Sequence, residues 1–243
     1  MRTTRLYCPE IDDTSDIFSL PVSAHRHAVQ VLRLKQGAPL RLFNGSGLEV
    51  DVVLEQVSKR ESSVRIIERV NVDNESPLYT TLLQGISRGE RMDYAVQKAV
   101  ELGVNRIIPV ETERCNVQLS GGRSDKRLAH WQGVMISACE QSGRSIVPEL
   151  MGVMSLEEAL LVETKADCRL VLDPLAATGF SSLDKQNNIV LLIGPEGGLS
   201  EQEVQLAKQA DFQAVQFGPR ILRTETATVA ALAVIQTMWG DLG

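Results

Sequence analysis

The chain has no long apolar run and no segment typical of exported proteins. None of its 243 residues belongs to an uninterrupted apolar stretch near the length of about 18 residues that a membrane helix needs. The opening residues, MRTTRLYCPEIDD, lack the apolar core of a signal peptide. We therefore expect a protein that acts in the cytoplasm and does not contact a membrane.

Cysteine and histidine are scarce, and neither occurs in a pattern that binds metal. The sequence has no CxxC spacing and no cysteine beside a histidine, which predicts reduced thiols rather than a disulfide framework or a zinc site. The histidines lack a carboxylate-rich spacing, so ordinary core or solvated histidines are favoured over metal ligands or proton shuttles. We expect no metal. The cysteines are Cys8, Cys115, Cys139 and Cys168, and the histidines are His25, His27 and His130.

The common catalytic motifs are also missing. The absence of GxxxxGK[ST] argues against a P-loop nucleotide site. No GxGxxG opens a helix after a strand, which argues against a dinucleotide fold and against an ordinary Rossmann methyltransferase. GxSxG and HExxH do not occur either, so the familiar serine hydrolase and zinc protease templates are excluded.

Positive charge is in deficit overall but is concentrated locally. The net charge is −6, which is not typical of a nucleic-acid binder. Residues 1–74, however, are balanced at ten basic and ten acidic side chains, and the segment His25–Leu48 has four cations and no carboxylate. Such a cluster can neutralise phosphates, although charge alone leaves a merely solvated basic face equally open. The four cations are Arg26, Arg33, Lys35 and Arg41.

The pattern of predicted strands and helices differs between the two parts of the sequence. Up to Arg69, short strands and turns with one helix at His25–Leu34 predict a small β-rich module. The polar stretch 70–77 ends in proline, and we place the domain boundary there, giving domains 1–72 and 73–243. Beyond it, alternating strands and helices favour an α/β domain with a mostly parallel sheet. Strands are expected at 78–86, 106–110, 169–173, 189–193 and 214–217, and helices at 90–102, 126–141, from 200, and 228–239.

Two loops follow apolar strands of this domain, where open parallel sheets bind ligands. Residues Gly194–Gly198 carry little side-chain bulk, and Ser200 and Glu203 have the spacing of a capping box. Residues Gln216–Ala227 place two arginines, a glutamate and two hydroxyls before the last helix, which Thr224 or Thr226 can cap. Such groups are costly to bury without purpose. An ordinary strand-to-helix turn and a solvated helix start are the alternative interpretations.

Five segments together carry a family resemblance. They are LLIGPEGGLS (191–200), GPRILRTETA (218–227), SRGERMDYAVQKAVELGV (87–104), ETERC (111–115) and ACEQSGR (138–144). Their combination resembles the RsmE family of SPOUT methyltransferases, the 16S ribosomal RNA uridine-N3 methyltransferases. The likeness extends over the whole chain, because the amino-terminal module resembles a PUA-like β-barrel.

The resemblance implies a fold, a cofactor and partners. Residues 73–243 would form a SPOUT-type trefoil-knotted domain with a parallel sheet, an exception to the rule that chains do not thread loops. Residues 1–72 would form the PUA-like, RNA-binding barrel. The family pattern also implies a homodimer, S-adenosyl-L-methionine as cofactor, and 16S rRNA in the assembled 30S subunit as substrate. The implied cofactor-binding residues are Leu172, Pro174, Gly194, Pro195, Glu196, Gly197, Gly198, Phe217, Gly218, Ile221 and Leu222.

The chemistry of uridine N3 selects candidates among these motifs. N3 carries a proton and is a poor nucleophile until that proton leaves, so the site must stabilise negative charge on the ring. Arg223 is the first candidate for this. Glu225 or Glu140 is the candidate base, and water is the alternative. The barrel would add phosphate contacts, and RNA shape would supply most of the specificity. The candidates for RNA contact are Arg26, Arg33, Lys35, Arg88, Arg114 and Arg144.

Two other functions fit parts of the pattern. A catalytically inactive RNA-binding or assembly factor could keep the fold, but the intact motifs argue against it. A SPOUT enzyme acting on transfer RNA or on a ribose hydroxyl is a nearer alternative, and the SRGERM and ACEQSGR segments favour the uridine-N3 branch instead.

Overall fold

The computed structural model describes residues 3–11, 15–70, 72, 74–115, 122–162 and 165–243. The chain forms two compact units, of which the first comprises residues 1–75 and 139–147 and the second residues 76–138 and 148–243. The expected linker, 70–77, includes Asn71 and Asp73, which lie outside the described residues. The return of residues 139–147 to the first unit is a long-range feature that composition does not reveal.

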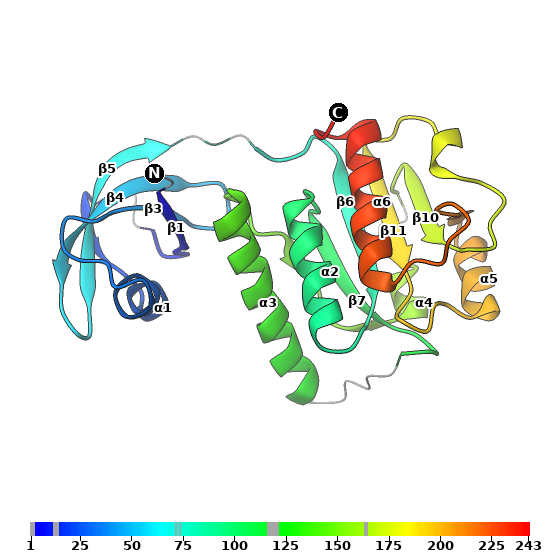
Figure 1. Cartoon of the computed structure of the whole chain (residues 1–243), viewed down its shortest axis with the longest axis horizontal. Coiled ribbons are helices and arrows are strands. Elements are labelled where there is room, and N and C mark those ends of the chain that lie inside the picture. The colour runs from blue at the N-terminus through cyan, green and yellow to red at the C-terminus, as the bar shows by residue number, and fades with distance from the viewer. Residues whose placement is uncertain (1–2, 12–14, 71, 73, 116–121, 163–164) are drawn as a thin grey trace. The chain divides into compact units, whose positions relative to one another are not determined.

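The first unit is built on a five-stranded sheet with the strand order β1-β3-β4-β5-β2 (Figure 1). Apolar side chains alternate with polar ones along β3, where Leu40 and Leu42 are buried and Arg41 is half-buried, so one face of the strand contributes to the core. The β-rich module expected from the sequence is therefore present. The strands are β1 (Thr4–Tyr7), β2 (Ile17–Ser19), β3 (Pro39–Phe43), β4 (Glu49–Val57) and β5 (Ser62–Val70).

The helix expected at His25–Leu34 is wrong in both extent and type. A short α1 (Val22–His25) continues as a π-helix, η1 (Arg26–Val31). Apolar spacing does not separate the wider π turn from an α turn, and π segments are rare, so the sequence favoured an ordinary helix. After η1, Arg33 takes a positive φ of 55°, which ends the helical path.

The second unit contains a seven-stranded sheet with the order β12-β10-β11-β6-β7-β8, and β9 also pairs with β7. Every pairing in it is parallel. The central strands β6 and β11 are buried almost throughout, as expected in a parallel sheet covered on both faces. β11 is a continuous apolar run, whereas β6 also buries Thr80, Thr81 and Gln84. The strands are β6 (Tyr79–Gly85), β7 (Arg106–Glu111), β8 (Glu149–Leu150), β9 (Met154–Ser155), β10 (Cys168–Leu172), β11 (Asn188–Ile193) and β12 (Gln213–Val215).

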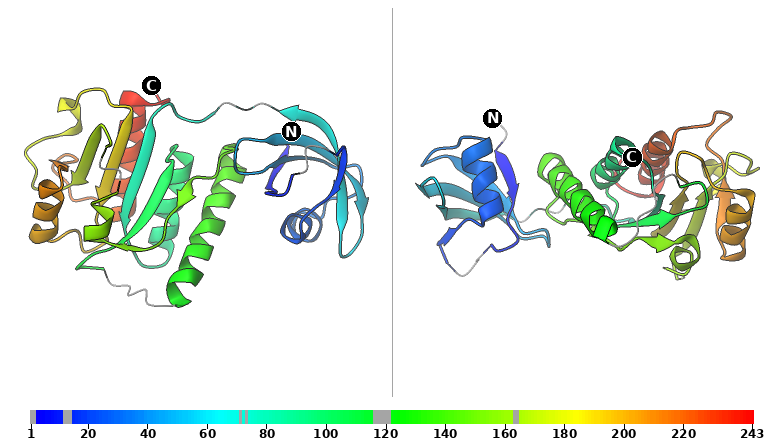
Figure 2. Two further views of the ribbon diagram at one scale, coloured as in Figure 1. Left: turned by 180° about the vertical axis from the view of Figure 1, so that it is seen from behind. Right: turned by 90° about the horizontal axis from the view of Figure 1, so that it is seen from below.

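Helices cover both faces of this sheet. On one face α2 (Glu90–Glu101) packs beside α6 (Thr224–Trp239), as the front and rear views show (Figure 1, Figure 2). On the other face, α4 (Leu156–Ala159) and α5 (Glu201–Gln209) join a core that includes Leu83 and Val190. The remaining helices are α3 (Gly122–Ser142) and the 3-10 turn η2 (Phe180–Ser182). The α/β class expected from the alternating pattern is confirmed.

The last helix begins earlier than the sequence predicts. We expected Thr224 or Thr226 to cap a helix starting at 228, but α6 starts at Thr224 and its N-cap residue is Arg223, whose side chain makes no capping bond. The Thr224 hydroxyl is used in a tertiary hydrogen bond instead. The trefoil knot stays a prediction from the family resemblance. Among the described residues, no helix combines the length and apolarity needed to span a bilayer.

Candidate cofactor site

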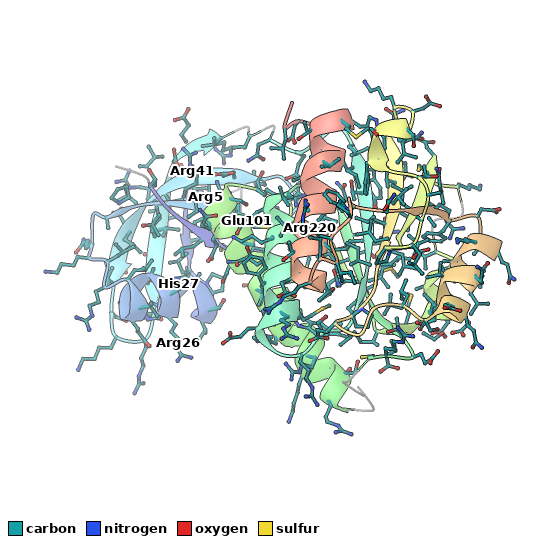
Figure 3. The ribbon with its side chains drawn as sticks, turned by 45° about the vertical axis from the view of Figure 1, so that its right-hand side comes forward. Arg5, Arg26, His27, Arg41, Glu101 and Arg220 are labelled. Atoms are coloured by element: carbon teal, nitrogen blue, oxygen red, sulfur yellow. The ribbon has the colours of Figure 1, made fainter. Side chains whose placement is uncertain are left out.

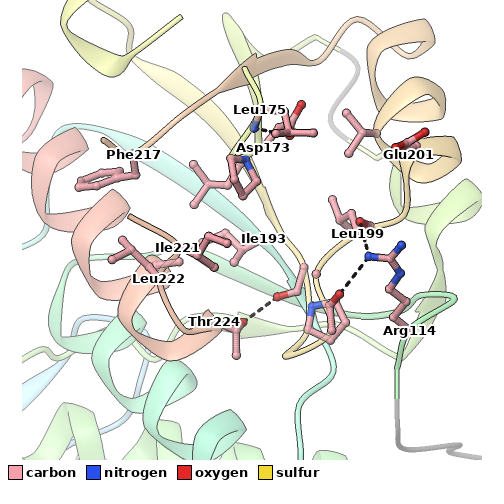
Figure 4. Close-up of a pocket in the computed structure, with 18 of the residues that line it drawn as sticks. Arg114, Asp173, Leu175, Ile193, Leu199, Glu201, Phe217, Ile221, Leu222 and Thr224 are labelled. Carbon is pink, nitrogen blue, oxygen red and sulfur yellow. Dashed lines mark hydrogen bonds between the residues drawn. The ribbon is translucent and has the colours of Figure 1, made fainter. Parts of the chain in front are cut away.

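A cavity of about 1100 Å³ lies at the carboxyl ends of three neighbouring strands of the second unit. Its walls come from the residues after β10, from the glycine-rich loop after β11 and from the loop between β12 and α6 (Figure 4). Parallel strands end at one edge of a sheet, so the topology gathers loops that are far apart in the chain. The lining includes both polar side chains and apolar ones, among the latter Leu172, Ile193 and Leu222.

All the residues predicted to bind a cofactor line this cavity. The structure therefore brings together the two loops that the sequence singled out. It adds residues that sequence reasoning missed, among them Asp173, Leu175 and Thr224. Asp173 stands between two predicted residues, Leu172 and Pro174, so its position directly after a buried strand was the available signal.

A buried polar network fixes the start of the glycine-rich loop. The Thr224 hydroxyl donates a hydrogen bond of 2.7 Å to the carbonyl oxygen of Gly194 and accepts one of 3.1 Å from the Gln84 side-chain amide. The hydroxyl of Thr228 donates to the side-chain oxygen Oε1 of Gln84 at 2.7 Å. Gln84 and Thr228 are fully buried, so these bonds are shielded from competing water. The network joins β6, the start of α6 and the cavity loop.

Arg114 supports the same loop from another side. Its guanidinium donates to the carbonyl oxygens of Gly197 and Leu199, at 3.3 and 3.4 Å (Figure 4). A Cβ added to Gly197 would lie 2.8 Å from the Cβ of Arg114. The glycine at this position therefore makes room for Arg114, a protein contact that the interpretation of Gly194–Gly198 as a backbone cradle did not foresee.

Replacing Gly197 by alanine should disturb this contact. We expect the free energy of unfolding to fall by about 1 to 3 kcal/mol, because overpacking forces the neighbouring backbone to shift. Gly152→Ala is the control, since a Cβ there would meet nothing within 4 Å. Urea unfolding of both variants measures the difference, and equal stability would contradict the close approach.

Glu203 holds a third segment against the site. This buried carboxylate accepts a hydrogen bond of 2.7 Å from the backbone N–H of Glu113 and one of 2.8 Å from that of Ser200. The second bond, together with the bond from the Glu203 N–H to the Ser200 hydroxyl, completes the capping box expected from the sequence. The first ties the loop that carries Arg114 to the beginning of α5.

Glu203→Gln should therefore be destabilising although it is nearly isosteric. The amide has one acceptor oxygen for two N–H donors, and its NH₂ group would face a donor, so we expect a loss of about 1 to 3 kcal/mol. Glu201→Gln, on the exposed side of the same helix, should change stability by less than about 0.5 kcal/mol. Thermal and urea unfolding distinguish the two variants, and an unchanged Glu203→Gln protein would rule out this role.

Glu196 links the cavity loop to the segment before α2. Its carboxylate accepts hydrogen bonds from the Arg88 backbone N–H at 2.9 Å and from the Arg91 guanidinium at 3.2 Å. Burial acts to raise the pKa of Glu196, but these hydrogen bonds and the charge of Arg91 outweigh it and hold the pKa below its usual value. The side chain is therefore a carboxylate at neutral pH.

The candidate catalytic residues fall in different units. Arg223 is exposed and lies between two residues that line the cavity, Leu222 and Thr224. Glu225 follows in the first turn of α6, and its buried Oε2 has no hydrogen-bond partner among the described residues. Glu140 belongs to the first unit, where it accepts a hydrogen bond of 3.0 Å from the Tyr7 N–H. Arg223 and Glu225 therefore belong to the unit that contains the cavity and adjoin its lining residues in the chain, although neither lines it, whereas Glu140 belongs to the first unit.

The candidates for RNA contact are likewise divided. Arg26, Arg33 and Lys35 are exposed on the first unit, and Figure 3 shows Arg26 at the start of η1. Arg144 belongs to the same unit but is only 4% exposed, and its guanidinium is paired with Glu75. Arg88 and Arg114 are exposed in the second unit, on the two segments that support the cavity loop.

Two of the four cysteines are buried and unreactive at neutral pH. All four are free. Burial raises the pKa of Cys8 and of Cys139 to about 11, so both stay protonated at neutral pH. Within the described part of the chain, no group of three or more His, Cys, Asp or Glu residues could hold a metal ion.

Comparison with known proteins connects these features to a family. Residues 74–236 match the RNA methyltransferase domain, and residues 24–67 match the RNA methyltransferase PUA domain. Ribosomal RNA small subunit methyltransferase E of Buchnera aphidicola subsp. Schizaphis graminum is 34% identical over 99% of this chain and 98% of that protein. The Bacillus subtilis protein of the same name is 33% identical over 90% of this chain and 89% of that protein.

Two solved structures resemble this chain over its full length. A ribosomal RNA small subunit methyltransferase E of Neisseria gonorrhoeae bound to S-adenosyl methionine is 43% identical, with a TM-score of 0.93 and 100% of both chains covered. A methyltransferase of Legionella pneumophila in complex with the same cofactor is 40% identical, with a TM-score of 0.96 and equal coverage. The family match, the amino-terminal PUA domain and the glycine-rich cavity agree, and the chain belongs to the ribosomal RNA small subunit methyltransferase E family, RsmE, that its motifs resemble.

Proposed function

We propose that this chain methylates N3 of one uridine in 16S ribosomal RNA, with S-adenosylmethionine as the methyl donor. The observation that carries the proposal is the cavity at the ends of β10, β11 and β12, which brings together the two loops that the sequence singled out, in a chain of this family. The relatives named above are rRNA methyltransferases, and two solved neighbours hold the cofactor.

The residues present fit the cofactor. A cavity of about 1100 Å³ is large enough for it, since ligand pockets usually measure about 300 to 1,000 Å³. The loop that borders the cavity requires glycine, because a Cβ on Gly194 would lie 2.9 Å from the N of Leu199. Leu172, Ile193 and Leu222 would hold the apolar parts, and the backbone of 194–198 would bind the polar ones. When bound, the cofactor supplies an electrophilic methyl group.

Arg223 and Glu225 would prepare the uridine for methyl transfer. Glu225 would accept the N3 proton, since its Oε2 has no hydrogen-bond partner among the described residues. The Arg223 guanidinium would stabilise the negative charge that the ring oxygens then carry. In support, Arg223 is the N-cap residue of α6 and Glu225 lies in its first turn, next in the chain to Leu222 and Thr224, which line the cavity. Exclusion of water from the site would strengthen the electrostatic interactions of both residues with the uridine.

Substrate binding would be shared between the two units. The exposed cations Arg26, Arg33 and Lys35 suit phosphate contacts, which position an RNA without reading its sequence. The net charge of −6 works against loose RNA, so we propose that the assembled 30S subunit is the substrate. Methylation rates on 30S subunits should exceed those on free 16S rRNA, and equal rates would contradict this part of the proposal.

We also propose that the active form is a homodimer in the cytoplasm, where ribosomal particles are available. Leu175 and Ile221, at the edge of the cavity, are 84% and 86% exposed. Apolar side chains that stay so exposed beside a binding site favour a protein contact, and a second copy would cover them. Light scattering of the purified chain should give the mass of two copies, and a monomer at all concentrations would contradict the proposal.

Calorimetry with S-adenosylmethionine tests the cofactor assignment without RNA. We expect saturable binding by the wild-type chain. A chain that releases no heat and shows no competition with the reaction product, S-adenosylhomocysteine, would contradict the proposed function and favour an inactive RNA-binding protein instead.

A further inference from the structure

Asp173 is a buried carboxylate in the cavity that the proposed chemistry does not use. It directly follows β10 and is 9% exposed. One carboxylate oxygen, Oδ1, accepts a hydrogen bond of 2.9 Å from the Leu175 N–H, which holds the side chain in place (Figure 4). The other, Oδ2, lies 3.9 Å from the Lys208 ammonium, beyond hydrogen-bond distance.

The position of Asp173 leaves acceptor capacity for a ligand. A carboxylate can accept about four hydrogen bonds, and the described residues supply only one to Asp173. A buried charge with so few partners is costly in a site without a ligand. Lys208 is 40% exposed in its side chain and balances the charge at some distance, so the pair is neutral overall. Because Lys208 already balances the charge of Asp173, hydroxyl groups are better suited to this carboxylate than a second cation would be.

The neighbouring elements indicate which hydroxyls these are. β10 pairs in parallel with β11, so Asp173 stands at the end of the strand next to the one that carries the glycine-rich loop. In dinucleotide-binding folds, an acidic residue at a strand end beside the glycine-rich loop binds the hydroxyls of a ribose. The same juxtaposition arises here without a GxGxxG motif and with a different strand order.

We propose that Asp173 binds the ribose of the cofactor by accepting hydrogen bonds from its vicinal hydroxyls. This inference rests on the proposed function, because S-adenosylmethionine and S-adenosylhomocysteine share that ribose. Asp173 makes the cavity specific for a ribonucleoside: a deoxyribose leaves part of the carboxylate without a donor, and the unmet acceptor weakens binding.

Calorimetry with S-adenosylhomocysteine and its 2′-deoxy and 3′-deoxy forms tests the role of Asp173. The wild-type chain should bind the ribose form more tightly than at least one deoxy form by about 10- to 100-fold, as expected for a hydrogen bond to a charged group. Asp173→Ala should reduce this ratio to about 1. Asp173→Asn preserves the volume and should give an intermediate ratio, because a neutral acceptor binds a hydroxyl more weakly.

Asp184→Asn is the matched control, because Asp184 is an exposed aspartate of the same unit that does not line the cavity, and its ratio should equal that of the wild type. A ratio that is the same in the wild type and both Asp173 variants would overturn the inference, even if those variants bind more weakly. If Asp173→Asn weakened the binding of S-adenosylmethionine much more than that of S-adenosylhomocysteine, each relative to the wild type, the inference would be overturned too, since the carboxylate would then recognise the sulfonium charge. A wild-type chain that binds neither compound would contradict the proposed function itself.

Discussion

Arg223→Ala is expected to lower the rate constant for methyl transfer by about 10²- to 10³-fold, the usual effect of removing one group that stabilises developing negative charge. Arg223 is exposed at the start of α6 and does not itself line the cavity. Its interaction with the uridine ring would therefore be made mainly in the transition state, and affinity for S-adenosylmethionine should stay unchanged. Single-turnover kinetics and calorimetry measure the two quantities separately.

Two further variants sharpen this test. Arg223→Lys keeps the charge but loses the planar fork of donors, so it should retain part of the rate. Lys185→Ala removes an exposed cation of the same unit and should leave the rate unchanged. Full activity of Arg223→Ala would remove Arg223 from the mechanism, and a parallel loss of cofactor affinity would show that it acts on the cavity instead.

Thr224→Val should weaken both the cavity and the fold. The valine leaves the Gly194 carbonyl oxygen without its hydroxyl donor and takes an acceptor away from the Gln84 amide. We expect the free energy of unfolding to fall by about 1 to 3 kcal/mol, the penalty for unsatisfied buried polar groups. Because the affected carbonyl belongs to the cavity loop, affinity for S-adenosylmethionine should fall by about tenfold or more, in line with an energy of this size.

Thr226→Val is the control for this substitution. Thr226 is exposed two residues further along the same helix, so the β-branched replacement has a similar effect on helix propensity without touching the network. Urea unfolding and calorimetry on the two variants should separate them clearly. Equal behaviour of the two proteins would mean that the hydrogen bond to Gly194 does not hold the loop.

The features that could be predicted from the sequence are those with local patterns. The buried strand β11 is a continuous apolar run, and the capping box of Ser200 and Glu203 is a spacing of three residues, so both could be predicted from the sequence. The loops that line the cavity were found because they follow such strands. The family resemblance then supplied the cofactor, which periodicity does not show.

The features that escaped prediction are long-range. Glu203 meets the Glu113 N–H across 90 residues, and Gln84 meets Thr224 across 140. Nothing in the sequence near either residue indicates its partner. The same holds for residues 139–147, which belong to the first unit although the chain has already entered the second. Because the sequence does not show that Glu140 belongs to the first unit, it could not distinguish Glu140 from Glu225 as the candidate base.

Methyl transfer from labelled S-adenosylmethionine to 30S subunits that lack the modification is the most direct test of the proposed reaction. Digestion of the RNA and mass spectrometry of the nucleosides identify the product. We predict label in 3-methyluridine at a single position of 16S rRNA. Label in a ribose-methylated nucleoside, or incorporation into transfer RNA but not into 30S subunits, would contradict the proposed function and assign this cavity to a different RNA substrate.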